Sequence, residues 1–162
     1  MTVTTKSLIL RNLDDTHTLG LTLGRLSRGG DVICLDGDLG AGKTCLTQSI
    51  AKGLEVDPQF YISSPSFAIL HEYEGRIPLY HMDFYRLTGV DDVLESGFEE
   101  YFYLSGLTVI EWSQRVVEIL PQHSLRLDIT VLGETLRKVH FSTVDGDWFE
   151  RLAPFFKKFS TD

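Results

Sequence analysis

The sequence predicts an α/β fold of three layers, in which a parallel central sheet is extended by antiparallel strands. Two short apolar runs, 31–37 and 107–112, are bounded by turn residues and are typical of buried parallel strands. A helical pattern at 43–54 follows the first run after a glycine-rich loop. Segments 125–132 and 136–143 alternate apolar and polar residues, which favours half-solvated antiparallel strands at one side of the sheet.

The remaining elements are predicted from the same two periodicities. A helix is expected within the segment 14–30. Acidic residues stand at its start, and Gly29-Gly30 follow its end. Further elements are expected as strands within 67–73 and 78–83, an acidic helix over 90–102, and a short helix over 113–121.

The C-terminal segment carries an aromatic stripe at helical spacing between Trp148 and Phe159. Pro154 lies inside this segment and is predicted to break or restart the helix, because proline has no backbone N–H. Packing in the core is the preferred interpretation of the stripe, with a partner-docking face as the alternative.

Length and composition place the chain among ordinary globular proteins. Residues 1–162 are expected to form a single domain, with 43% hydrophobic and 23% charged residues. No stretch reaches the roughly 18 consecutive apolar residues of a membrane span, and the first residues lack a secretory signal pattern. Cys34 and Cys45 are interpreted as small buried hydrophobes. We therefore expect a cytoplasmic protein without a membrane partner.

The formal net charge is −8, and no basic run exceeds the doublets Arg137-Lys138 and Lys157-Lys158. A protein that binds nucleic acid directly is expected to carry a basic patch. Any role in RNA metabolism is therefore expected to run through a partner.

Residues 37–44, Gly-Asp-Leu-Gly-Ala-Gly-Lys-Thr, fit the phosphate-binding motif G-x-x-x-x-G-K-[ST]. The glycines allow backbone N–H groups to point at phosphate oxygens, Lys43 reaches the β- and γ-phosphates, and the Thr44 hydroxyl ligates Mg²⁺. The helix that opens at Lys43 adds its positive N-terminal end. The predicted nucleotide contacts in this P-loop are Gly37, Asp38, Leu39, Gly40, Ala41, Gly42, Lys43, Thr44 and Cys45.

The motif lies between a predicted strand and a predicted helix, which is the context that it requires. The sequence therefore predicts a P-loop NTPase-like fold that binds a nucleotide. The guanine signature [NT]-K-x-D is absent from the chain, so ATP is favoured.

Three further segments carry groups that hydrolysis needs beside a P-loop. Ser66 follows a Ser/Pro turn, Asp83 stands at a predicted strand end with Arg86 three residues on, and Glu111 ends a buried strand. A buried carboxylate is costly unless it is paired or near a cation. Each segment also has a simpler interpretation. The Ser/Pro stretch is then only a turn, Asp83 and Arg86 form only a salt bridge, and Glu111 is only a helix cap.

The segments GDLGAGKT, SPSF, HMDFYRL and VIEW, in this order, resemble the TsaE family, the ATPase component of the bacterial machinery that makes threonylcarbamoyladenosine in tRNA. The resemblance runs from the first predicted helix to the hairpin after Leu120. It implies binding of ATP or ADP with Mg²⁺ and slow ATP hydrolysis. It also implies support of the TsaB and TsaD proteins, which carry out the tRNA chemistry.

The resemblance also implies roles for single residues. Asp83 and Glu111 are implied as the catalytic acids, and Trp112 as the tryptophan beside the nucleotide. The groups implied around Mg²⁺ are Thr44, Ser66, Asp83 and Glu111, and the residues implied to shape the site are His81, Tyr85 and Arg86. Two departures are visible: Ser66 replaces the usual threonine, and Ser113 stands where proline commonly follows the Glu-Trp pair.

Two other functions stay open at this point. A small-molecule kinase needs basic groups for the transferred phosphoryl group, yet no Lys or Arg lies between Arg86 and Arg115. A nucleotide-sensing binding module without significant hydrolysis would use the same binding residues. Substitution of Asp83 or Glu111 discriminates between hydrolysis and binding alone.

Overall fold

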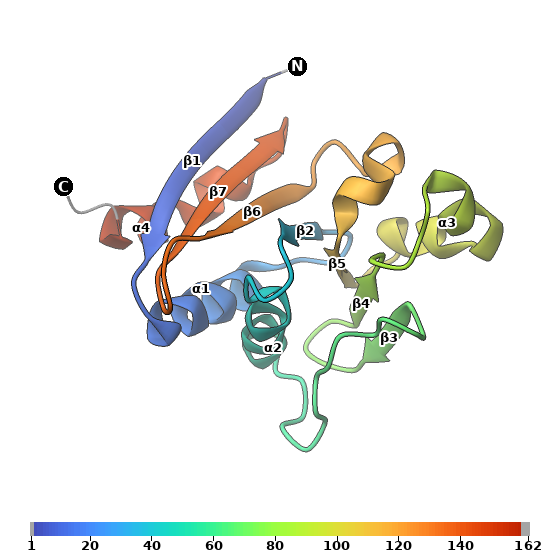
Figure 1. The fold of residues 1–162 in the computed structure, drawn as a ribbon, viewed down its shortest axis with the longest axis horizontal. Coiled ribbons are helices and arrows are strands. Elements are labelled where there is room, and N and C mark those ends of the chain that lie inside the picture. Colours follow the sequence, from blue (N-terminus) through green and yellow to red (C-terminus); the bar gives the residue numbers. More distant parts are fainter. Residues whose placement is uncertain (1, 160–162) are drawn as a thin grey trace.

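The computed structural model describes residues 2–159 (Figure 1). The strands are β1 (Val3–Leu10), β2 (Val32–Gly37), β3 (Leu70–Tyr73), β4 (Leu79–Asp83), β5 (Leu107–Glu111), β6 (Leu125–Val131) and β7 (Arg137–Val144). The helices are α1 (Leu13–Leu26), α2 (Lys43–Gly53), α3 (Val90–Ser96) and α4 (Trp148–Phe159), with 3₁₀ helices η1 (Phe98–Tyr103) and η2 (Ser113–Ile119).

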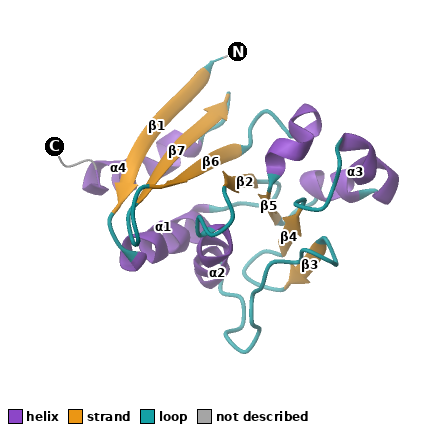
Figure 2. Ribbon diagram, in the orientation of Figure 1, coloured by secondary structure: helices purple, strands orange, loops and turns teal. Residues whose placement is uncertain are grey.

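The strands form one seven-stranded sheet in the order β1-β7-β6-β2-β5-β4-β3. Strands β6, β2, β5 and β4 pair in parallel at its centre. Strands β7 and β1 add antiparallel pairs on one side, and β3 adds one on the other. The predicted parallel sheet with antiparallel additions is therefore confirmed (Figure 2).

Helices cover the sheet on two faces, and the alternation of strand side chains explains why. In β2, Ile33 and Leu35 belong to an apolar cluster shared with α1, α2 and α4. Val32 and Cys34 point the other way, into a second cluster shared with α3, η1 and η2. Because β2 is buried on both faces, its sequence is a continuous apolar run, and the three-layer prediction is confirmed.

Helices α1 and α2 pack closely through glycine. A Cβ atom at Gly20 would lie 2.2 Å from the Cβ atom of Ser49, and one at Gly24 would lie 2.3 Å from the Ile50 carbonyl oxygen. Glycine is therefore needed at both positions for the two backbones to approach. This packing fixes α2, whose first residue is Lys43, against the sheet.

The edge strand β1 has no counterpart among the elements predicted from sequence. Its burial alternates only at the end, where Leu8 and Leu10 are buried, while Val3 and its neighbours are exposed. The strand pairs with β7 from the other end of the chain, Leu8 opposite Val139. Tertiary pairing of this kind leaves little local signal.

The acidic helix predicted over 90–102 is wrong as one helix. Helix α3 ends at Ser96, because Gly97 adopts φ 75° as its C-cap, and the chain continues as η1. Glycine takes this left-handed conformation without the steric penalty of other residues. The helix predicted over 113–121 is a 3₁₀ helix, with non-helical φ/ψ at Val116.

Helix α4 runs through Pro154 without a break, so the predicted interruption is wrong. Its aromatic stripe is buried as expected, with Trp148, Phe155 and Phe156 in the cluster beneath the sheet. Burial of this stripe offsets the backbone hydrogen bond that proline lacks. Within residues 2–159, no helix has the length and apolar character needed to cross a membrane.

Candidate functional site

The candidate site lies where β2, β4 and β5 end, at the carboxyl edge of the parallel strands. Asp83 ends β4 and Glu111 ends β5, and the two are direct partners in the β-sheet register. The glycine-rich loop follows β2 and leads into α2. Open α/β sheets bind ligands at this edge, since the loops there converge on the helix N-termini.

A pocket of 440 Å³ opens between these elements. It brings together most of the residues that the sequence predicted for nucleotide and metal binding. Its lining consists of Leu39, Gly40, Ala41, Gly42, Lys43, Thr44, Cys45, Ser64, Ser66, Asp83, Tyr85, Arg86, Glu111 and Trp112. Gly37 and Asp38 do not line it, but their carbonyl oxygens contact Lys43.

The loop takes its shape from three glycines with positive φ. Gly37, Gly40 and Gly42 have φ of 151°, 81° and 106°. At Gly37 space is also limiting, because a Cβ atom would lie 2.6 Å from the Ile129 carbonyl oxygen. The loop therefore needs glycine for backbone conformation, and at its first position also for close approach.

Lys43 folds back over this loop. Its Nζ donates to the carbonyl oxygens of Gly37 at 2.5 Å and Asp38 at 3.0 Å. It also lies 4.3 Å from the centre of the Trp112 ring, a cation–π contact. Burial lowers the pKa of Lys43, and the negative charges of Glu111 and Asp83 oppose that effect.

Glu111 is one of two buried carboxylates in the site, with 2% of its surface exposed. Thr44 Oγ1 donates to its Oε1 at 3.1 Å and lies 3.4 Å from its Oε2. On the other side, His81 Nε2 lies 2.5 Å from Oε2. The prediction that a carboxylate at this strand end must be partnered is confirmed.

Asp83 is held by Ser64, which sequence reasoning interpreted only as part of a turn. Ser64 Oγ donates to Asp83 Oδ2, and the backbone N–H of Tyr85 donates to Oδ1 at 2.9 Å. Ser66 lines the same pocket two residues further on. The Ser-Ser-Pro-Ser stretch offered several hydroxyls, and only the path of the loop decides which one meets the carboxylate.

Aromatic and basic side chains form the outer wall. Trp112 adopts φ 62° between β5 and η2, and its ring centre lies 4.9 Å from that of Tyr85. The Arg115 guanidinium lies 5.7 Å from the Trp112 ring centre. The Arg86 guanidinium lies 4.0 Å from the Phe67 ring centre. The interval 87–114, which contains no Lys or Arg, is therefore flanked in sequence by two arginines that lie near the site.

A second pocket, of 280 Å³, adjoins the first and shares Ala41, Gly42 and Cys45 with it. Its other walls are the start of α1 and the β6–β7 hairpin: Asn12, Leu13, Thr16, Glu134, Thr135 and Arg137. Arg137 Nε donates to the Ala41 carbonyl oxygen at 3.0 Å. Sequence reasoning missed this hairpin wall, because Arg137 lies 96 residues from Ala41 in the loop that it contacts.

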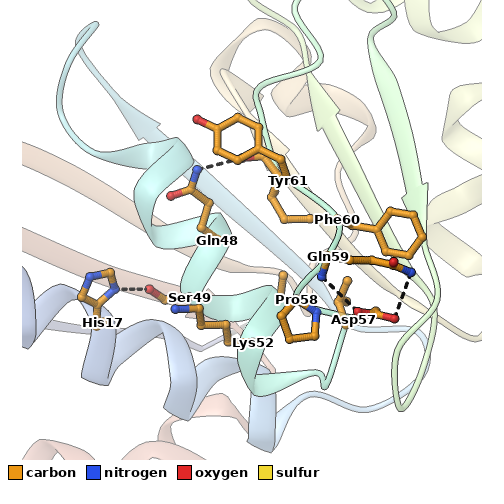
Figure 3. A pocket seen from close by; sticks show the side chains of 12 residues that line it. His17, Gln48, Ser49, Lys52, Asp57, Pro58, Gln59, Phe60 and Tyr61 are labelled. Carbon is orange, nitrogen blue, oxygen red and sulfur yellow. Dashed lines mark hydrogen bonds between the residues drawn. The ribbon is translucent and has the colours of Figure 1, made fainter.

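A third pocket, of 480 Å³, lies between α1, α2 and the segment 56–62 (Figure 3). Gln48 Nε2 donates to the Ile62 carbonyl oxygen at 2.8 Å, and His17 Nδ1 lies 2.6 Å from Ser49 Oγ. None of its lining residues lines either of the other two pockets. It is the largest of the three, yet it lies apart from the paired carboxylates.

Over residues 2–159, no cluster of three or more His, Cys, Asp or Glu side chains is arranged to hold a metal ion. The oxygen donors of the main pocket are instead spread over several residues, among them Thr44, Ser66, Asp83 and Glu111. A metal bound there would need further ligands from its substrate or from water.

Comparison with known proteins gives a consistent result. The family model for the threonylcarbamoyl adenosine biosynthesis protein TsaE matches residues 10–139. The tRNA threonylcarbamoyladenosine biosynthesis protein TsaE of Treponema pallidum is 40% identical over 131 residues, which are 81% of this chain and 96% of the relative. The protein of the same name from Bacillus subtilis is 38% identical over 142 residues, 87% of each chain.

Among solved structures, the crystal structure of Bacillus subtilis YdiB matches with a TM-score of 0.74 and 33% identity. The match covers 99% of both chains. This likeness confirms the predicted P-loop fold class, and the sequence matches extend over the glycine-rich loop and both carboxylates. The chain belongs to the TsaE family, whose members take part in tRNA threonylcarbamoyladenosine biosynthesis.

Proposed function

We propose that the protein binds ATP with Mg²⁺ in the 440 Å³ pocket and hydrolyses it slowly in support of the TsaB and TsaD proteins. The observation that carries the proposal is the meeting of Lys43, Thr44 and Glu111 at the start of α2. A lysine, a hydroxyl and a carboxylate at the N-terminus of a helix are the groups that phosphoryl chemistry requires.

The two adjoining pockets suit two parts of one nucleotide. The pocket with Lys43 and the carboxylates suits the β- and γ-phosphates. The smaller pocket shares Gly42 and Cys45 with it and is closed by Arg137 and the start of α1, so it suits the nucleoside. ADP would fill the same two spaces apart from the γ-phosphate position.

The donor set fits Mg²⁺. This ion takes hard oxygen ligands and is commonly held by one or two carboxylates together with phosphates and water. Thr44, Glu111, Asp83 and Ser66 offer such oxygens, and the spread of these donors agrees with a metal that arrives with its nucleotide. Bound Mg²⁺ would neutralise charge on the β- and γ-phosphate oxygens.

The chain's own groups supply the rest of the chemistry. Lys43 exchanges its loop carbonyl partners for phosphate oxygens, which hold it more strongly because they are charged. Glu111 and Asp83 orient the attacking water, and one of the two carboxylates accepts its proton. Trp112 shields the phosphates from solvent and keeps Lys43 in place.

Hydrolysis then changes the loop that carries Ser64 and Ser66. Ser64 donates a hydrogen bond to Asp83, so a displacement of this carboxylate also displaces the loop. A partner that recognises one arrangement of the loop becomes dependent on ATP. The net charge of −8 agrees with a cytoplasmic subunit that reaches tRNA only through TsaB and TsaD.

The decisive experiment is Mg²⁺-dependent ATP turnover of the purified protein, alone and with the TsaB–TsaD pair. We expect little turnover alone, clear stimulation by the pair, and loss of turnover in Lys43→Ala. An ATP turnover rate that is the same with and without TsaB–TsaD would contradict the partner assignment and favour a small-molecule kinase. ATP binding without turnover under both conditions would identify a nucleotide-sensing switch instead.

A further inference from the structure

We infer that His81 is a positioning residue that fixes the orientation of the Glu111 carboxylate, an inference that rests on the proposed function. His81 lies in the middle of β4 and is fully buried. Its Nε2 lies 2.5 Å from Glu111 Oε2. Glu111 lines the 440 Å³ pocket and can contact a substrate there, whereas His81 does not line this pocket.

Packing alone does not explain a histidine at this position. Side chains on the same face of β4 and β5 include Leu79, Leu107 and Val109, which are all fully buried and apolar. An apolar side chain would suit these neighbours, since burial of a polar ring is unfavourable without hydrogen bonds. The contact with Glu111 is therefore what the ring provides.

The second ring nitrogen supports this interpretation. His81 Nδ1 is buried without a hydrogen-bond partner among the described residues. A carboxylate accepts hydrogen bonds, so the short contact requires the hydrogen on Nε2. The structure thereby selects the Nε2–H tautomer, because a buried Nδ1–H without an acceptor is more costly than a bare ring nitrogen.

Glu111 is thus held from two sides by different elements. His81 from β4 holds Oε2, and Thr44 from α2 donates to Oε1 at 3.1 Å. Loss of the His81 contact leaves the carboxylate free to rotate about its side-chain bonds. Residues that orient an ionic ligand or base in this way change activity or metal affinity by about 10- to 100-fold when removed.

The test compares His81→Leu, which removes the donor, with His81→Gln, which places an amide N–H at about the reach of Nε2. We expect His81→Leu to lower kcat for ATP with TsaB–TsaD by about 10- to 100-fold and His81→Gln to recover most of it. Affinity for ADP without Mg²⁺ should stay close to that of the parent. His140→Leu on β7, whose ring bonds Ser7 outside the site, is the matched control.

A double-substitution cycle separates this inference from the proposed function. In a Glu111→Gln background, His81→Leu is expected to cause little further loss, because the two residues act as one unit. If Glu111→Gln leaves turnover unchanged, the catalytic assignment fails. If Glu111→Gln lowers turnover and His81→Leu in the parent protein does not, the inference alone is overturned.

A readout without turnover tests the geometry itself. Long-range ¹H–¹⁵N spectra of the imidazole nitrogens, assigned by comparison with His81→Gln, are expected to show a hydrogen on Nε2. A ring protonated at Nδ1 only would overturn the inference. Thermal unfolding of each variant shows whether a loss of kcat reflects a folded protein.

Discussion

At the scale of single residues, Lys43 lies near the carboxylates of the site but forms no direct ion pair with them among the described residues. Its ammonium group donates to loop carbonyl oxygens and faces the Trp112 ring. Glu111 meanwhile is bonded to Thr44 and His81. This separation keeps the lysine available for an anionic ligand, because carbonyl partners are weaker than carboxylate partners.

The two cysteines give a prediction at this scale. Burial raises the pKa of Cys34 to about 12 and, less strongly, raises that of Cys45, which lines both the 440 Å³ and the 280 Å³ pocket. The reactive thiolate is therefore scarcer at neutral pH than in a free cysteine. We expect iodoacetamide to label Cys45 before Cys34, more slowly than a free thiol, and faster as the pH rises through the Cys45 pKa.

Peptide mass spectrometry over a pH series measures both rates. Mg-ADP is expected to slow the labelling of Cys45 at every pH, since the proposed nucleotide covers the thiol. Labelling of Cys45 that is unchanged by saturating nucleotide would contradict the proposed position of the ligand. Cys34 serves as the internal control, because it is fully buried away from the pockets.

At the scale of elements, the ends of β2 and β5 are tied together beside the site. Asp36, just before the glycine-rich loop, accepts from Ser113 Oγ at 2.8 Å and from Arg126 Nη2 at 2.7 Å. Ser113 directly follows Trp112, so one buried carboxylate links the loop strand to the turn that carries the tryptophan. Ser113 thus supplies a hydrogen bond that ties this turn to the end of β2.

Helix α4 gives a stability prediction. Pro154 is exposed in the interior of the helix and cannot donate to the carbonyl of the residue four before it. Pro154→Ala restores this donor and removes the ring, so the free energy of unfolding is expected to rise by about 1–3 kcal/mol. Urea denaturation followed by circular dichroism measures the change.

Ala153→Gly, at an exposed position of the same helix, is the matched control and should lower the free energy of unfolding by about 1 kcal/mol. A Pro154→Ala variant that is less stable than the parent would show that the proline ring contributes to packing. The proposed ATP turnover should be unaffected in both variants, since α4 lines neither the 440 Å³ nor the 280 Å³ pocket.

At the scale of the whole molecule, the excess of acidic groups affects the pH dependence of stability. Burial raises the pKa of Asp128 on β6, and the charge of Asp36 adds to this effect against Arg126 and His140. The folded state therefore holds the Asp128 proton to higher pH than the unfolded chain does. The contribution of Asp128 to the free energy of unfolding therefore falls as the pH rises from about 3.8 through the raised pKa. Above that pH the contribution of this group stays constant.

Asp128→Asn removes this titration. Relative to the parent, the variant is expected to gain stability as the pH rises through this window, by less than about 1 kcal/mol because the carboxyl is half-solvated. At pH 3 the two proteins should differ little. Chemical denaturation at pH 3, 5 and 7 measures the difference, and a variant that loses stability between pH 3 and 7 relative to the parent would contradict the prediction.

The sequence by itself predicted the candidate site residues and determined the central elements of this protein. The glycine-rich loop, Lys43 and Thr44 have a local spacing that fits the phosphate-binding motif, and continuous apolar runs specify strands buried on both faces. Asp83 and Glu111 were found because both stand at strand ends, and parallel strands bring such ends to one edge of the sheet.

Only the tertiary structure decided which groups meet across elements. Strand β1 depends on β7 from the far end of the chain, and the Arg137 wall depends on a hairpin folding back over the loop. Ser64 rather than Ser66 bonds Asp83, and His81 meets Glu111, through contacts between residues distant in sequence. Hydrophobic periodicity reports which face of an element is buried, but not which side chains lie opposite, because that depends on how the elements pack.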